Sequence, residues 1–137
     1  FLAFTAAELV PGVELVMASV GLAQLLAGAD VVFTGEGGVD LQSRAGKVPH
    51  PVAALAAAHG VGTVIFGGRI DPAMDPDAEP GVIAYVPIVR EVTDLPHALA
   101  EGERNLERAA ELVTRLLVAR GPAKGPAGDV VGGSAEG

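Results

Sequence analysis

The segment VVFTGEGGVDLQSRAGKVPHP, residues 31–51, decides the fold prediction because its character changes twice. The apolar run 29–33 that leads into it is typical of a buried parallel strand. Residues 34–46 are rich in glycine and polar side chains, which predicts a loop. A helix is expected over 48–59, since prolines are tolerated in a first helical turn. The segment therefore predicts a strand, a glycine-rich loop and a helix in succession.

The flanking sequence supplies the other layers of an α/β domain. Apolar residues at helical spacing predict a helix over 13–28, and short apolar runs predict strands at 63–66 and 82–88. Between these strands, the acidic and proline-rich stretch 71–80 predicts an exposed loop. The amphipathic stretch 95–120 predicts the longest helix. This order predicts an α/β fold, Rossmann-like in its layering, with a mostly parallel sheet and flanking helices.

Composition narrows the classes of function. The 137 residues contain no cysteine, which excludes disulfides and thiolate metal sites and fits a cytoplasmic protein. The net charge is −8, so the chain offers no basic surface to nucleic acid, and an anionic membrane surface would repel it. No apolar run approaches the roughly 20 residues of a membrane span. We therefore expect neither nucleic acid nor a membrane as a partner.

The two ends of the sequence differ from its middle. The chain begins with an apolar stretch and no methionine, so we expect it to be a fragment of a longer protein. Residues 1–120 carry the apolar periodicities of a folded domain. Residues 121–137 are rich in glycine and proline and are expected to form a disordered tail.

Two familiar phosphate-binding motifs are absent from the glycine-rich segment. A P-loop requires a glycine where Leu41 stands, and a serine or threonine where Val48 stands. A dinucleotide fingerprint requires its third glycine at Asp40, where a carboxylate would face the pyrophosphate. Neither reading of the segment is therefore supported.

The segment nevertheless contains the groups that phosphoryl transfer needs. Glycines let backbone N–H groups approach a ligand, carboxylates can hold Mg²⁺ directly or through water, and cations can neutralise phosphate oxygens. The glycines are Gly35, Gly37 and Gly38, the carboxylates are Glu36 and Asp40, and the cations are Arg44 and Lys47. Alternatively, this is a structural turn whose surface ion pairs contribute only ~0–1 kcal/mol each. Arg69 and Asp71 follow the next strand and would lie on the same sheet edge.

The run GADVVFTGEGGVDLQSRAGKVPHPVAALA, residues 28–56, resembles the signature of the type I glycerate kinase family. That pattern reads close to A-D-L-V-I-T-G-E-G-R-x-D-x-Q-[ST]-x-x-G-K-x-P-x-G-V-A and aligns without a gap. The resemblance extends to all of the chain except residues 121–137. Two departures, Gly38 for the pattern's arginine and Pro51 for its glycine, put substrate choice and activity in doubt. The matching positions are Ala29, Asp30, Thr34, Gly35, Glu36, Gly37, Asp40, Gln42, Ser43, Gly46, Lys47, Pro49, Val52 and Ala53.

The resemblance implies a two-domain kinase that transfers the γ-phosphate of ATP to glycerate with Mg²⁺. Residues 1–120 would form its C-terminal part, and the missing N-terminal part of the same protein would complete the cleft, so the chain alone would be poorly active. A homodimer is also possible under this interpretation. The implied catalytic residues are Asp40, Lys47 and Glu36, with Asp40 and Glu36 also as metal ligands. The implied substrate- or phosphate-binding residues are Gly35, Gly37, Gln42, Ser43 and Gly46. The chemistry of the segment adds Gly38 and Arg44, which the pattern does not require.

A second interpretation belongs to another class of protein. The chain would then be a non-catalytic domain that descends from the kinase and binds a nucleotide or a small anion. The changes at Gly38 and Pro51 and the missing first part favour this alternative.

Overall fold

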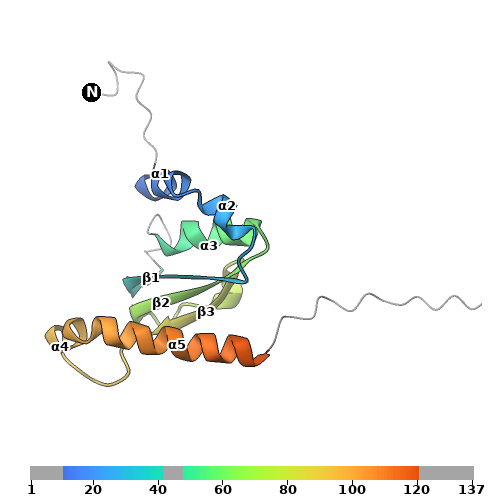
Figure 1. Cartoon of the computed structure of the whole chain (residues 1–137). Coiled ribbons are helices and arrows are strands. Elements are labelled where there is room, and N and C mark those ends of the chain that lie inside the picture. The colour runs from blue at the N-terminus through green and yellow to red at the C-terminus, as the bar shows by residue number, and fades with distance from the viewer. Residues whose placement is uncertain (1–10, 42–47, 121–137) are drawn as a thin grey trace, which may run out of the picture.

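The structure, a computed structural model, describes residues 11–41 and 48–120, and these form a layered α/β unit (Figure 1). Its strands form one sheet in the order β1-β2-β3, and both neighbouring pairs are parallel. The elements are α1 (Gly12–Ser19), α2 (Leu22–Leu26), β1 (Val31–Val39), α3 (Pro49–Ala58), β2 (Gly62–Ile70), the 3₁₀ helix η3 (Pro76–Ala78), β3 (Val82–Pro87), α4 (Leu95–Ala100) and α5 (Gly102–Arg120). The predicted α/β class and parallel sheet are confirmed.

Each face of the sheet has its own hydrophobic cluster. On one face, Leu26 of α2 and Ala56 of α3 pack with Val61, at the entrance to β2. On the other face, Phe66 of β2 packs against Ala109 of α5. Figure 1 shows the result, with α1, α2 and α3 above the sheet and α5 below it. The central strand β2 is therefore covered on both sides, as a parallel strand requires.

The glycine-rich segment is the main correction to the predicted secondary structure. Residues 34–39 belong to β1 and not to a loop, and β2 likewise continues past the predicted 63–66 through its own glycines to Ile70. Glycine is needed here because the strands approach closely. A Cβ on Gly35 would lie 2.5 Å from the carbonyl oxygen of Phe66, its register partner. Strand pairing therefore requires a glycine at position 35.

The predicted helices exist, but two of them are interrupted. The predicted helix 13–28 is divided into α1 and α2 at Gly21, whose φ of 65° lies in the left-handed region. The predicted helix 95–120 is divided into α4 and α5 at Glu101. The predicted helix 48–59 is confirmed as α3. The expected tail, residues 121–137, lies outside the described residues.

The crossover from β2 to β3 runs beside α3. Most of the predicted loop 71–80 is irregular, apart from η3, which Asp75 caps by accepting a hydrogen bond from the Asp77 N–H. A Cβ on Gly81 would lie 2.5 Å from the Cβ of Ala57, so the end of the crossover packs directly on α3. Among the helices of the described residues, none has the length and apolar character needed to cross a membrane.

Candidate functional site

The candidate site lies where the parallel strands end. The segments that follow β1 and β2 leave the same edge of the sheet, and the backbone joins them there, because the N–H of Asp71 donates to the carbonyl of Val39 at 2.9 Å. Ligands of open parallel sheets bind at this carboxyl edge. Two carboxylates were singled out from the sequence: Glu36 is among the last four residues of β1, and Asp40 directly follows the strand.

An ion pair joins the two strand ends. Oδ2 of Asp40 lies 3.6 Å from Nη2 of Arg69, with 27% of the Asp40 side chain and 68% of the Arg69 side chain exposed. Such an exposed pair contributes little to stability, so its interest is in placing a cation beside the carboxylate. Asp71 has a local role, since its Oδ1 accepts the N–H of Ala73 at 2.8 Å. Of the two residues expected on this edge, Arg69 is therefore the one that reaches Asp40.

The extended conformation of β1 separates Glu36 from Asp40. Four residues of strand span about 13 Å between their Cα atoms, at the usual rise of a strand. Two carboxylates that far apart do not readily coordinate one ion directly, so at most one would be a direct ligand and the other would act through water. Among the described residues, no group of three or more histidine, aspartate or glutamate side chains is placed to hold a metal. Mg²⁺ needs fewer, because it usually keeps several waters and binds one or two carboxylates together with substrate phosphates.

The glycines of β1 fall into two kinds. Gly35 is held against the backbone of β2, as described above. A Cβ on Gly37 or Gly38 would meet no heavy atom within 4 Å, although the carbonyl of Gly37 lies close to Gly68. The space beside Gly37 and Gly38 therefore stays open for a ligand or for a longer side chain.

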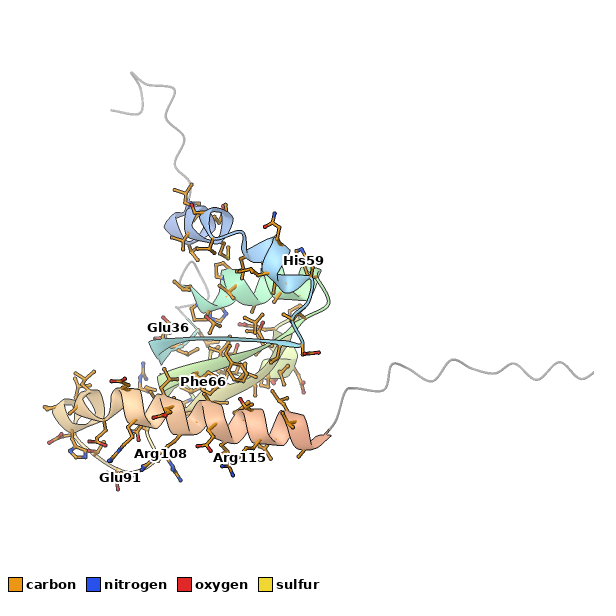
Figure 2. All side chains as sticks on the ribbon, in the orientation of Figure 1. Glu36, His59, Phe66, Glu91, Arg108 and Arg115 are labelled. Atoms are coloured by element: carbon orange, nitrogen blue, oxygen red, sulfur yellow. The ribbon has the colours of Figure 1, made fainter. Side chains whose placement is uncertain are left out.

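A cavity of about 720 Å³ extends from these glycines to the C-terminal helices. Its apolar wall includes Phe33 and Phe66, whose ring centroids are 5.2 Å apart in an edge-to-face arrangement, and Leu99 of α4. Figure 2 shows Phe66 between the sheet and α5. Arg69 and Glu103 supply charged groups at its lining. The cavity was not foreseen from the sequence, where residues 95–120 predicted only an amphipathic helix.

The remaining residues predicted for the site are placed less directly. Five of them lie outside the described residues: Gln42, Ser43, Arg44, Gly46 and Lys47. Just after this segment, the side chain of His50 is only 10% exposed, and its Nδ1 lies 2.8 Å from Oε2 of Glu79. That contact ties the first turn of α3 to the crossover, which is a structural role.

The comparisons with known proteins agree with one another. Residues 1–118 match the glycerate kinase family. A glycerate kinase from Halalkalibacterium halodurans is 37% identical over 109 residues, which cover 80% of this chain and 29% of that protein. A glycerate kinase from Haemophilus influenzae is 34% identical, with the same two shares covered.

A solved structure gives the same answer at the level of the fold. The crystal structure of a putative glycerate kinase 2 from Salmonella typhimurium LT2 superposes with a TM-score of 0.63 at 31% identity. The match covers 86% of this chain and 30% of that one. The chain thus spans less than a third of the length of the relatives that it matches, and over that span it belongs to the glycerate kinase family.

Proposed function

We propose that this chain is part of an enzyme that phosphorylates glycerate with ATP and Mg²⁺. The observation that carries the proposal is the position of the signature segment. Its glycines and its Asp40 stand at the carboxyl end of β1, beside Arg69 and next to a large cavity. Family membership supports the reaction class, and the 29% coverage of the curated relative means that the rest of the protein would supply the other wall of the cleft.

Each group of this chain has a definite task in the proposed site. Asp40 either binds Mg²⁺ or accepts a hydrogen bond from the reacting hydroxyl of glycerate. Arg69 offers a guanidinium to the anionic substrates, and Gly37 and Gly38 leave the backbone accessible to them. Bound MgATP would supply the transferable phosphoryl group. The chain itself contributes positioning and electrostatic stabilisation, which are the main sources of catalysis in phosphoryl transfer.

Glu36 and Lys47 complete the proposed set. Glu36 would act on Mg²⁺ through water, because the strand keeps it away from Asp40. Lys47 would neutralise phosphate oxygens, as its position in the family pattern implies. We also propose a cytoplasmic location, which the absence of cysteine supports.

The decisive experiment measures glycerate-dependent release of ADP by the longer protein that contains this chain, with Mg²⁺ present. Replacing Asp40 by asparagine should lower kcat/KM by about 10² or more, the scale expected when a positioned acid–base or metal-binding group is lost. Asp77→Asn is the matched control, because it removes the same charge at an exposed position of η3. Wild-type rates in Asp40→Asn would remove Asp40 from the mechanism.

The alternative function is favoured by one observation, the glycine at position 38 beside open space where the family pattern has an arginine. If the folded, full-length protein binds ATP or glycerate but releases no ADP, the protein is a binding domain and the kinase proposal fails.

A further inference from the structure

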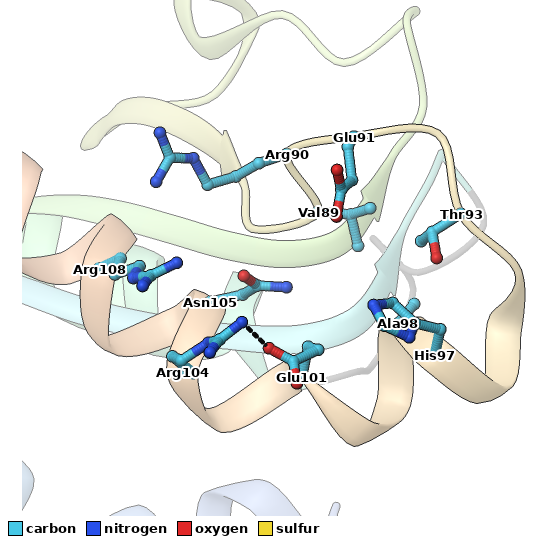
Figure 3. A pocket seen from close by; sticks show the side chains of 10 residues that line it. All are labelled: Val89, Arg90, Glu91, Thr93, His97, Ala98, Glu101, Arg104, Asn105 and Arg108. Carbon is cyan, nitrogen blue, oxygen red and sulfur yellow. Dashed lines mark ion pairs between the residues drawn. The ribbon is translucent and has the colours of Figure 1, made fainter.

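A second pocket lies at the carboxyl end of the third strand. The segment after β3, residues 89–93, arches beside α4 and the start of α5, and together they enclose about 320 Å³ (Figure 3). Arg90 lines this space from the segment, while Arg104, Asn105 and Arg108 line it from α5. The lining groups therefore come from two separate elements and not from one helix face.

The charge of this pocket is unusual for the chain. The whole sequence has 9 lysines and arginines against 17 aspartates and glutamates, yet three of its arginines line this one space. Arg104 forms an ion pair with Glu101, which Figure 3 marks with a dashed line. Arg90 and Arg108 form no ion pair with any residue in the part of the chain that the structure describes. Glu91 and Glu101 line the same space, so three arginines face two carboxylates there, and the remaining positive charge favours an anion.

A solvated helix face does not account for the arrangement as well. On α5, Arg108 stands three residues before Glu111, at a spacing that permits an ion pair. Glu111 instead binds Arg115, with Oε1 at 2.6 Å from Nη2 and 3.0 Å from Nε. Arg108 therefore lines the pocket without an ion pair to Glu111. Asn105 adds an amide that can both donate and accept hydrogen bonds.

We propose that this pocket binds a small phosphate-bearing anion. Guanidinium groups give paired N–H donors that match phosphate oxygens, and Arg90 and Arg108, which no carboxylate of the described residues holds in an ion pair, can both supply them. The volume is at the lower end of the range for small-molecule pockets, so a phosphate ester fits as well as free phosphate. Glu91 also lines the pocket and opposes the anion, which limits its affinity.

The pocket adjoins the larger cavity of the candidate site. Val89 and Ala98 line both spaces, so an anion held by Arg90 and Arg108 would lie next to whatever occupies the cavity. The proposal does not depend on kinase activity, since it concerns equilibrium binding of an anion by residues of this chain.

The test is a titration of the ¹⁵N-labelled chain with inorganic phosphate at constant ionic strength, followed by NMR shifts of the Asn105 side-chain amide. We expect saturable binding that weakens about tenfold in Arg108→Ala and in Arg90→Ala, because each loses a charge-assisted contact. Arg115→Ala is the matched control. It removes the same charge from a position two turns further along α5, where the Arg115 guanidinium is already paired with Glu111. It should change the affinity less than twofold, and Glu91→Gln should increase it.

The outcomes separate the proposal from diffuse attraction of anions. Shifts that rise linearly and are matched by chloride, or equal weakening in Arg115→Ala and Arg108→Ala, would overturn it. Glycerol phosphate is the second probe. Tenfold tighter binding of this ester would identify an organic phosphate as the occupant, whereas equal affinities would identify free phosphate. Both results support the pocket, and failure of the kinase assay would leave them unchanged.

Discussion

Alanine at Gly35 and alanine at Gly38 should have opposite effects, although the two glycines lie three residues apart on the same strand. At Gly35 the new Cβ would stand 2.5 Å from the carbonyl oxygen of Phe66. An ordinary carbon–oxygen contact is about 3.3–3.6 Å, so β1 and β2 would have to separate by roughly 0.8–1.1 Å. The obstacle is backbone in the middle of the sheet and cannot rotate away.

The magnitude follows from two contributions. Forcing an extra methyl group into a packed site costs about 1–3 kcal/mol, and a weakened backbone hydrogen bond adds about 1 kcal/mol. We therefore expect Gly35→Ala to lower the free energy of unfolding by about 2–4 kcal/mol. At Gly38 the Cβ meets nothing within 4 Å and φ is not positive, so alanine fits. Its expected effect is between zero and a gain of about 1 kcal/mol, from the lower entropy of the unfolded chain.

Urea unfolding of both variants, followed by far-ultraviolet circular dichroism, checks this pair. With a slope of about 2 kcal/mol per molar urea, Gly35→Ala should lower the midpoint by about 1–2 M, while Gly38→Ala should leave it unchanged or slightly higher. A Gly35→Ala midpoint equal to that of the wild type would refute the idea that strand pairing demands this glycine. A large loss in Gly38→Ala would show that the space beside it is filled.

Two further stability predictions concern one buried and one partly buried side chain. Ile65 of β2 is 0% exposed, so Ile65→Ala should cost about 2–5 kcal/mol in the same urea experiment, and a loss below 1 kcal/mol would contradict its place in the core. His50→Ala should lower thermal stability by the equivalent of about 1 kcal/mol, because Glu79, whose side chain is 15% exposed, loses this contact, whereas the exposed His97→Ala should not.

The order of the elements could be predicted because each leaves a local pattern. Apolar runs mark the strands, and helical periodicity marks α3 and the stretch that holds α4 and α5. The extension of β1 through residues 34–39 could not be predicted in this way. Local rules assign glycine to turns, but Gly35 is required by a partner strand about 30 residues away. Its close approach to Phe66 exists only when the two strands are paired.

The candidate site was predictable to a similar degree. The chain order places Asp40 and Arg69 on one sheet edge, because both follow parallel strands. That the two residues meet at 3.6 Å depends on the register, which pairs Gly38 with Arg69. The arginine pocket was missed because its cations come from elements that are separated in sequence, and because charges at helical spacing are usually solvated. A signal was present in the clustering of arginine, since four of the seven arginines in the sequence lie within residues 90–115.

The order β1-β2-β3 has a practical consequence for handling the chain by itself. Among the described strands, β1 and β3 each have a hydrogen-bonded neighbour on one side only. A strand with a bare backbone edge can add a strand from another molecule, which is how sheets begin to aggregate. The net charge of −8 at pH 7 keeps the molecules apart, and this repulsion fades as the pH approaches the isoelectric point of about 4.7. Preparations should therefore turn cloudy on acidification, because molecules aggregate by pairing the exposed edges of their sheets.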